Sequence, residues 1–320
     1  MKCVAAVVAV LTGSLCGGCG VQQAVLGGDC LVMAMDELTT PGEVTVVRVQ
    51  VRSGDFLEGR PGLAVQFYRN GRLFKVTETG DDGLATITFA PDNAGDHILS
   101  VRLVPAGIAS QVPPPTELLV ACRPADTDIA VVDLDKTIVA SGFEAVLLGS
   151  PEPMARSQEV LARLAKTRTI VYMTHRPELL GPKSKAWMID HGFPAGPLLL
   201  SDTEGFLRGS ETYKTGRLAA LGKTFTNIHL GIGDKLSDAR AYLDNGMTAV
   251  LIPDIPQPGV NGQPRRLRAL ARRLRQFADD ENIHVVRGWD EVAEAVFSKK
   301  KHPPSAMRHR LIEMAGNGDR

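Results

Sequence analysis

Hydrophobic positions follow two different patterns along the chain, and the change falls close to residue 125. Up to Cys122, apolar and polar residues alternate in short runs that are rich in β-branched side chains. Such runs have the period of strands with one buried face. They occupy residues 43–51, 63–78, 84–90 and 97–104. Because no helical period interrupts them, the pattern predicts an all-β sandwich of the immunoglobulin type over residues 30–122.

Turn residues separate these runs. Asn70 and Gly71 stand between two apolar runs, and both central residues of a type I′ turn need a positive φ. Asp82 and Gly83 form a second turn signal. A stiff proline-rich stretch at 112–116 precedes the last strand. The polar segment 123–128 then predicts the junction between two domains.

After the junction, apolar runs alternate with helical segments. The runs lie at 129–134, 169–173, 198–200, 228–232 and 248–252. Helical periods occur between them, as at 154–166 and 235–245. This alternation predicts an α/β domain over residues 126–298, with a parallel sheet and helices on both of its faces. Residues 299–320 are expected to be a basic tail without a motif.

Bulk composition adds few constraints. The 320 residues are 44% hydrophobic and 22% charged, which is ordinary for a globular protein of two domains. The 36 basic side chains equal the 36 acidic ones. No global charge therefore favours nucleic acid as a partner, and nucleic-acid binding is not expected.

Residues 1–19 differ from the rest and predict export. One basic residue precedes an apolar stretch from Val4 to Leu15, which is too short to span a bilayer and is followed by small residues. The segment ending in Gly17-Gly18-Cys19 resembles the cleavage box of bacterial lipoproteins, in which the cysteine is lipidated. Cys16 stands where that family usually has leucine, so a plain cleaved signal is the alternative. The expected location is the cell envelope, with Cys19 carrying a membrane anchor.

Apart from the lipidated Cys19, two cysteines remain after such a signal is removed. Cys30 and Cys122 lie in the first and last strands of the predicted sandwich. In an oxidising compartment this even pair predicts a disulfide that joins the ends of the domain. The alternative is two unrelated buried thiols.

Polar residues of chemical interest follow the strands of the second domain. Each stands at the carboxyl end of a predicted strand or at the start of a helix. The set is Asp133, Asp135, Thr174, Lys214, Asp234 and Asp238. Because ligands bind beyond the carboxyl ends of parallel strands, these residues are predicted to converge on one crevice.

This combination of residue types suits the transfer of a phosphoryl group. A carboxylate attacks phosphorus only when cations offset the repulsion between the two anions. Asp133 is the predicted nucleophile, and Asp135 would protonate the leaving alcohol and then activate water. Thr174 would donate to a phosphoryl oxygen, and Lys214 would stabilise the developing charge.

The same region predicts a Mg²⁺ site, since magnesium favours oxygen ligands and substrate phosphate. The expected ligands are Asp133, the main-chain carbonyl of Asp135, and Asp234, with Asp238 as a further candidate. None of the seven histidines forms a metal-ligand pair, so the neighbouring His175 is predicted to be a wall residue. Arg176 either contacts substrate or forms an ion pair.

The ordered motifs resemble those of the haloacid dehalogenase (HAD) superfamily of phosphatases. These are Asp-x-Asp-x-Thr, Ser/Thr, Lys and Gly-Asp-x-x-x-Asp, and all four occur within residues 133–238. Two stretches, "WMIDHGFPAGPLLLSD" and "GIGDKLSDARAYLDNGM", are similar to the catalytic domain of lipins and related phosphatidate phosphatases. The resemblance covers about 130–255. It implies a HAD-like fold, a Mg²⁺-dependent phosphatase, and a lipid phosphate such as phosphatidate as the substrate.

Two positions depart from that family pattern. Lys136 stands where glycine is common and adds positive charge near the phosphate, and Asp234 replaces the asparagine usual in lipins. The second change resembles the metal motif of the wider superfamily. Soluble phosphates and phosphorylated polynucleotide ends are alternative substrates, and a non-catalytic surface-binding protein is the competing class.

A basic amphipathic segment lies at 264–277. Four apolar side chains share one helical face, and six arginines surround them. The apolar set is Leu267, Leu270, Leu274 and Phe277. The segment is predicted to be either an ordinary helix with a solvated basic face or an approach surface for anionic lipid.

Overall fold

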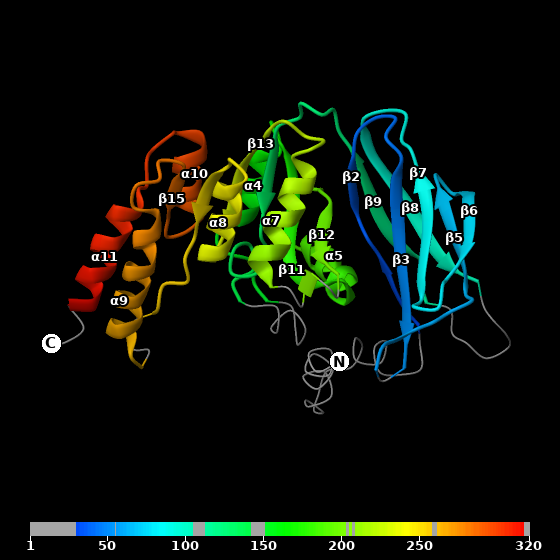
Figure 1. Ribbon diagram of the computed structural model, residues 1–320, viewed down its shortest axis with the longest axis horizontal. Coiled ribbons are helices and arrows are strands. Elements are labelled where there is room, and N and C mark those ends of the chain that lie inside the picture. Colours follow the sequence, from blue (N-terminus) through cyan, green and yellow to red (C-terminus); the bar gives the residue numbers. More distant parts are fainter. Residues whose placement is uncertain are drawn as a thin grey trace. The chain divides into compact units, whose positions relative to one another are not determined.

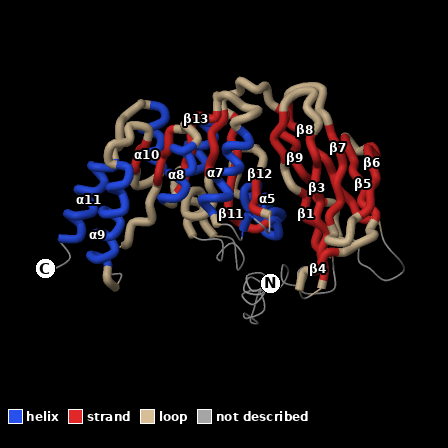
Figure 2. Tube along the Cα trace, viewed as in Figure 1, coloured by secondary structure: helices blue, strands red, loops and turns tan. Residues whose placement is uncertain are grey.

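The computed structural model describes residues 30–54, 56–104, 113–141, 151–202, 205–206, 209–257 and 261–316. Contacts divide the chain into two compact units. The first holds the described residues up to Pro124 with Pro177–Pro182 and Pro197–Leu199, and the second holds the remainder. Figure 1 and Figure 2 show a region of strands alone and a region that alternates strands with helices. The predicted signal, with Cys19, lies outside the described residues.

A β-sandwich of two sheets fills the first part of the chain. Its strands are β1 (Leu31–Ala34), β2 (Glu37–Thr39), β3 (Thr45–Ser53), β4 (Glu58–Gly59), β5 (Ala64–Arg69), β6 (Arg72–Glu78), β7 (Leu84–Phe89), β8 (Gly95–Leu103) and β9 (Thr116–Cys122). One sheet has the order β1-β3-β4 with β7 also on β3, and the other has the order β2-β9-β8-β5-β6. The predicted immunoglobulin-like sandwich is confirmed.

Alternation along the strands decides which faces form its core. Val47, Val49 and Val51 of β3 are fully buried, whereas Val46, next to Val47 in the same strand, is 49% exposed. Successive side chains of a strand point to opposite faces, so the β-branched residues at every second position pack into one layer. Phe67 of β5 belongs to the same core cluster.

The turn predicted at Asn70 and Gly71 is also confirmed. These residues join the antiparallel strands β5 and β6 with φ of 50° and 75°. Both values lie in the left-handed region that a type I′ turn requires. Gly83, at the second predicted turn, has φ of 78°, and a Cβ there would lie 2.3 Å from the carbonyl oxygen of Val51.

The predicted disulfide between Cys30 and Cys122 is wrong, because both thiols are free. Cys122 ends β9, and the parallel pairing of β2 with β9 places Thr39 opposite it. Cys30 instead precedes β1, whose strand pairs with β3 in the other sheet. One cysteine therefore lies in a strand of one sheet, and the other directly precedes a strand of the second sheet. The alternative prediction, two unrelated thiols, is the one that the structure supports.

The α/β region is built on a parallel sheet of six strands. Its elements are β10 (Ile129–Val132), α4 (Ser157–Leu164), β11 (Thr169–Pro177), η1 (Glu178–Leu180), α5 (Gly181–Asp190), β12 (Leu198–Ser201), α7 (Ser210–Leu221), β13 (Ile228–Gly233), α8 (Leu236–Asp244), β14 (Thr248–Leu251), α9 (Gln263–Arg273), η2 (Leu274–Phe277), β15 (Ile283–Val285), α10 (Trp289–Phe297) and α11 (Pro304–Gly316). The sheet order is β12-β11-β10-β13-β14-β15. This is the predicted HAD-like α/β architecture.

The strand order places a crevice at the end of β10. β10 pairs in parallel with β11 on one side and β13 on the other, and its four residues are fully buried. The chain's direction of winding reverses between these neighbours, and such switch points are where open α/β sheets bind ligands. The residues that directly follow β10 and β13 therefore meet at one edge.

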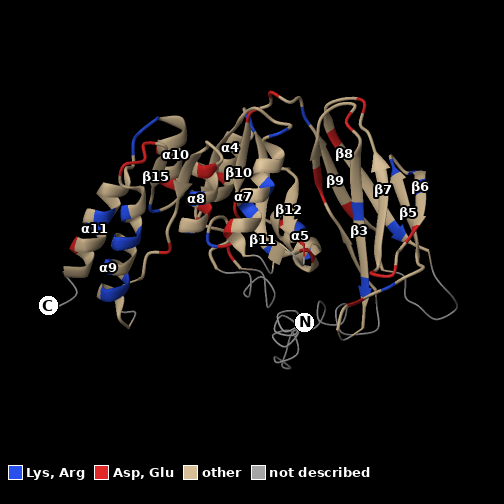
Figure 3. Cartoon of the chain, in the orientation of Figure 1, with Lys and Arg blue, Asp and Glu red and all other residues tan. Residues whose placement is uncertain are grey.

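Residues 299–320, expected only as a basic tail, include the helix α11. It packs against α9 and buries Met307, Leu311 and Ala315. The apolar face predicted for 264–277 is thus covered within the protein, which supports the reading of an ordinary packed helix with a solvated basic face. Figure 3 shows the Lys and Arg positions along α9. Within the described residues, no helix has both the length and the apolar character needed to cross a membrane.

Candidate active site

Asp133 follows β10 directly and is 2% exposed. Its N–H donates to the carbonyl oxygen of Ile232 at 2.9 Å, which continues the pairing of β10 with β13. The chain then turns, and Lys136 has φ of 55°. That left-handed conformation favours glycine, so it gives a backbone reason for the glycine common at this motif position.

Lys214 lies between two carboxylates. Its Nζ is 2.6 Å from Oδ1 of Asp133 and 2.7 Å from Oδ1 of Asp238. Burial alone would lower the pKa of Lys214, but the charges of Asp133 and Asp238 raise it well above its usual value. The structure therefore brings Lys214 to the carboxylates as a charged group, whereas the nearby Lys223 is exposed.

Two glycines of β13 make room for this arrangement. A Cβ on Gly233 would lie 2.7 Å from Oδ2 of Asp238, and one on Gly231 would lie 2.2 Å from the ring of Tyr242. Contacts this short do not occur between real atoms, so larger residues would force α8 away from the strand. The glycines are the local reason that Asp238 can reach Lys214.

A group of three buried carboxylates could hold a metal ion. One oxygen each from Asp133, Asp234 and Asp238 lies within 4.8 Å of the others. Oδ2 of Asp133 and Oδ1 of Asp234 are buried and accept no hydrogen bond from the described part of the chain. Buried carboxylate oxygens without partners are costly unless a cation receives them. The side chain of Asp135 is not in this group; its main-chain carbonyl stays a predicted ligand.

The pKa values of two of these carboxylates reflect the same crowding. Burial raises the pKa of Asp133 to about 6, with the Lys214 charge opposing the rise and the Asp238 charge adding to it. Burial raises the pKa of Asp234 to about 8, and the charges of Asp133 and Asp238 raise it further. Both shifts mark a site in which negative charge lacks compensation.

Asp135 is held by Arg176. Nη2 of Arg176 lies 2.6 Å from Oδ1 of Asp135 and Nε lies 3.0 Å from Oδ2, so the two side chains form a bidentate pair. Nη1 of the same arginine donates to Oγ of Ser184 at 2.8 Å. Of the two roles predicted for Arg176, the ion pair is the one observed.

Thr174 is buried in β11, beside the aspartates. Tyr172 is opposite Val132 in the parallel pairing, so Thr174, two residues on, lies next to the segment that follows β10. Its Oγ1 accepts the N–H of Arg176 at 3.3 Å. His175 stacks on Phe206 with ring centroids 5.0 Å apart, as expected of a wall residue.

Replacing Arg176 with methionine is expected to lower the free energy of unfolding by about 3–5 kcal/mol, because it leaves the Asp135 carboxylate without its partner. Arg176→Lys should lower the free energy of unfolding by a smaller amount, since lysine keeps the charge but not the bidentate geometry. Urea unfolding would measure both. Arg265→Met, on an exposed position of α9, is the matched control and should change stability little. Equal effects of Arg176→Met and the control would contradict the buried pair.

Comparison with known families agrees with this geometry. Residues 130–252 match the family described as PITM 1-3, LNS2 domain. This segment is an LNS2 domain. The domain belongs to the lipin-type HAD-like group, so the resemblance drawn from the motifs is confirmed. The LNS2 match spans β10 to the end of β14, and it contains all six predicted site residues.

Solved structures similar to the chain include immunoglobulin-like domains. The CARDB domain of PF1109 from Pyrococcus furiosus is 17% identical, with a TM-score of 0.25, 30% of this chain and 96% of that chain covered. Tandem Ig repeats of Dlar are 13% identical, with a TM-score of 0.22 and coverage of 34% and 59%. No curated protein matches the chain.

Sequence reasoning missed two partners of the site. Nζ of Lys136 lies 2.6 Å from Oδ2 of Asp254, and Ser184 orients Arg176. Asp254 follows β14 and Ser184 lies in α5, so neither stands in one of the four motifs recognised in the sequence. In the sequence, these two residues are marked only by their positions after or between predicted strands. Many other polar residues have similar positions, so the pattern does not single them out.

Proposed function

We propose that the LNS2 domain is a Mg²⁺-dependent phosphatase in which Asp133 accepts the phosphoryl group of a phosphomonoester. The observation that carries this proposal is the state of the Asp133 carboxylate. One of its oxygens accepts a hydrogen bond from Lys214, and the other is buried without a partner among the described residues. A carboxylate oxygen that is positioned, free of hydrogen bonds and close to a cation is suited to attack phosphorus.

The oxygen-only donor set fits Mg²⁺. Asp234 is the strongest candidate ligand, because it has a buried oxygen without a partner and does not bind Lys214, whereas Asp238 does. Asp133 would bind the metal through the oxygen that does not attack phosphorus. Magnesium prefers such oxygen ligands together with substrate phosphate. When bound, Mg²⁺ would offset the negative charge that the carboxylates and the phosphate bring together.

The reaction would take place in two displacements on phosphorus. In the first, an Asp133 oxygen bonds to phosphorus while the bond from phosphorus to the alcohol oxygen breaks, and Asp135 gives a proton to that oxygen. In the second, water attacks phosphorus, Asp135 takes the proton, and the bond to Asp133 breaks to release inorganic phosphate. Lys214 and Thr174 would balance the charge on the phosphoryl oxygens. Asp135 would carry a proton at the start of the first step and again after the second, and would form the bidentate pair with Arg176 only as a carboxylate.

A lipid phosphate, with phosphatidate as the first candidate, is the proposed substrate class. The similarity to lipins supports it, as does the expected export of the chain with a lipid anchor on Cys19. An anchor would hold the site near a bilayer and raise the local concentration of substrate without new contacts. Because α11 covers the apolar face of α9, any contact of that helix with lipid would be made by its arginines. Soluble phosphates are the alternative.

Purified protein is expected to hydrolyse p-nitrophenyl phosphate with Mg²⁺ and to stop when EDTA is added. Saturating Mg²⁺ should also raise the melting temperature by about 5 °C, since a ligand at 100 times its Kd stabilises the folded state by about 2.7 kcal/mol. The variant Asp234→Asn should lose most of the thermal shift. Turnover that continues unchanged in EDTA would contradict the metal requirement. A thermal shift without any turnover would favour the non-catalytic binding protein instead.

A further inference from the structure

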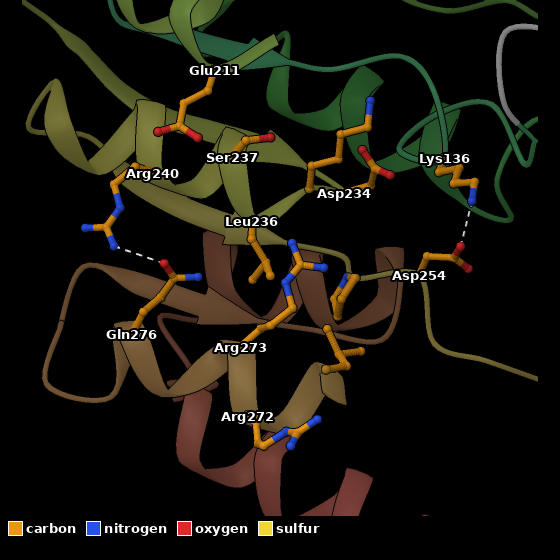
Figure 4. A pocket seen from close by; sticks show the side chains of 13 residues that line it. Lys136, Glu211, Asp234, Leu236, Ser237, Arg240, Asp254, Arg272, Arg273 and Gln276 are labelled. Atoms are coloured by element: carbon orange, nitrogen blue, oxygen red, sulfur yellow. Dashed lines mark hydrogen bonds and ion pairs between the residues drawn. The ribbon is translucent and has the colours of Figure 1, made fainter. Parts of the chain in front are cut away.

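A cavity of about 890 Å³ opens beside the metal-binding carboxylates and is lined by basic side chains. Asp234 forms part of its wall, whereas Asp133, Asp135, Thr174 and Lys214 do not. The cavity is therefore a neighbour of the reaction site, and the two share one carboxylate. Figure 4 shows side chains that reach it from α8, from the loop after β14 and from α9.

Positive charge is in excess around this cavity. Five basic side chains line it, namely Lys136, Lys235, Arg240, Arg272 and Arg273, against the three acidic residues Glu211, Asp234 and Asp254. Lys136 pairs with Asp254, and Arg240 donates to Gln276 at 3.1 Å (Figure 4). Arg272 and Arg273 are exposed, and within the described residues neither side chain makes an ion pair or a hydrogen bond. Lys235 makes no ion pair either, but its charge opposes the rise in the pKa of Asp234. The cavity thus has more basic than acidic side chains, and two of its arginines have no partner among the described residues.

The two α9 arginines lie beyond the segment that matches the LNS2 domain. That match therefore gives them no role, and the fold alone brings them to the site. The packing of α11 on α9 holds the helix in place, with Leu267 and Ala271 buried on its inner side. The packed helix fixes where the two arginine side chains begin, and guanidinium groups match the geometry of phosphate oxygens.

We propose that this cavity binds a second phosphate group of the substrate while the first phosphate is presented to Asp133. The proposal rests on the proposed function and narrows its substrate class to phosphomonoesters that carry another phosphate. Lys235, Arg272 and Arg273 would contact the second phosphate, and Asp234 would lie between the two anions with its metal. A phosphate close to the metal and to these three basic side chains gains attraction from both.

Matched soluble probes test the preference without a membrane. Fructose 1,6-bisphosphate is expected to have a kcat/KM at least about tenfold above that of fructose 6-phosphate, which is the effect of one hydrogen bond to a charged group. The double variant Arg272→Gln/Arg273→Gln should bring the ratio of the two values close to one. Arg265→Gln/Arg266→Gln removes the same charge from the same helix outside the cavity and should leave the ratio unchanged.

Calorimetric titration of the same probes gives a readout that needs no turnover. The bisphosphate should bind at least about tenfold more tightly than the monophosphate, and the cavity variant should lose the difference. Equal binding of the two probes would overturn the inference, while hydrolysis of both with Mg²⁺ would leave the phosphatase proposal standing. Selective binding of the bisphosphate without hydrolysis of either probe would support the cavity inference and contradict the phosphatase proposal.

An experiment with lipid substrates separates the two possible sources of the second phosphate, which are the substrate itself and a neighbouring lipid headgroup. Phosphatidate in neutral detergent micelles is compared with the same micelles containing phosphatidylglycerol, which offers a neighbouring phosphate. Activation by phosphatidylglycerol that depends on Arg272 and Arg273, without any preference for the soluble bisphosphate, would assign the cavity to a neighbouring headgroup and contradict the proposal. Preference for the bisphosphate, with no such activation, would support it.

Discussion

Replacing Asp133 with asparagine is expected to lower phosphatase turnover by at least about 1000-fold, since the amide cannot act as a nucleophile toward phosphorus. The variant should stay folded, because asparagine has the same shape and its Oδ1 can still accept the hydrogen bond that Lys214 now donates at 2.6 Å. Steady-state kinetics with Mg²⁺ and a far-ultraviolet circular dichroism spectrum would measure both properties.

The matched control for this change is Asp128→Asn. Asp128 precedes the same strand but is exposed, so the variant alters charge at the opposite end of β10. It should keep turnover within about twofold of the unmodified chain, as expected for a surface substitution away from the site. Full activity in Asp133→Asn, with the control also active, would exclude the nucleophile assigned here.

Replacing Lys214 with methionine is expected to produce a large loss of both stability and turnover. The Lys214 side chain is 1% exposed, and those of its partners Asp133 and Asp238 are 3% and 0% exposed. Removing it would leave two carboxylates buried without their shared cation, at a cost of about 3–5 kcal/mol. For a unit of this size the melting temperature should fall by about 10 °C. Turnover should be lost as well.

Lys223→Met is the control for the Lys214 experiment. Lys223 lies just beyond the end of α7, the helix that holds Lys214, and it is exposed. Its substitution should leave both the melting temperature and the turnover nearly unchanged. Thermal unfolding in EDTA is the appropriate measurement, because a bound metal ion would mask part of the charge imbalance. Similar melting temperatures for the two variants would contradict the buried three-residue contact.

The site could be predicted from sequence because its residues carry strong local constraints. Asp133 and Asp135 directly follow a fully apolar strand, and Gly233 precedes Asp234 at the end of another. A carboxylate at the end of a buried strand needs a cation, and strand ends of a parallel sheet meet at one edge. Other lysines lie near Lys214 in the sequence, and its burial against Asp133 and Asp238 separates it from the exposed Lys223.

Other features lacked such local constraints. β11 continues through Arg176 to Pro177, although the apolar run ends at Met173, and the buried Arg176 finds its polar partners, Asp135 and Ser184, in other segments. β15 has three residues, too few to show a strand period. The free thiols depend on strand pairing that cysteine spacing does not encode, and the cavity depends on how α9 docks.

A phosphoryl group covalently bound to Asp133 is the most direct measure of the proposed chemistry. Protein mixed with a ³²P-labelled phosphomonoester and Mg²⁺, quenched in acid during turnover, should carry a label that hydroxylamine removes, as expected of an acyl phosphate. Peptide mapping should place the label on the segment containing Asp133, and Asp133→Asn should take up none. Phosphatase turnover with no trapped label, or with the label on another residue, would contradict the account.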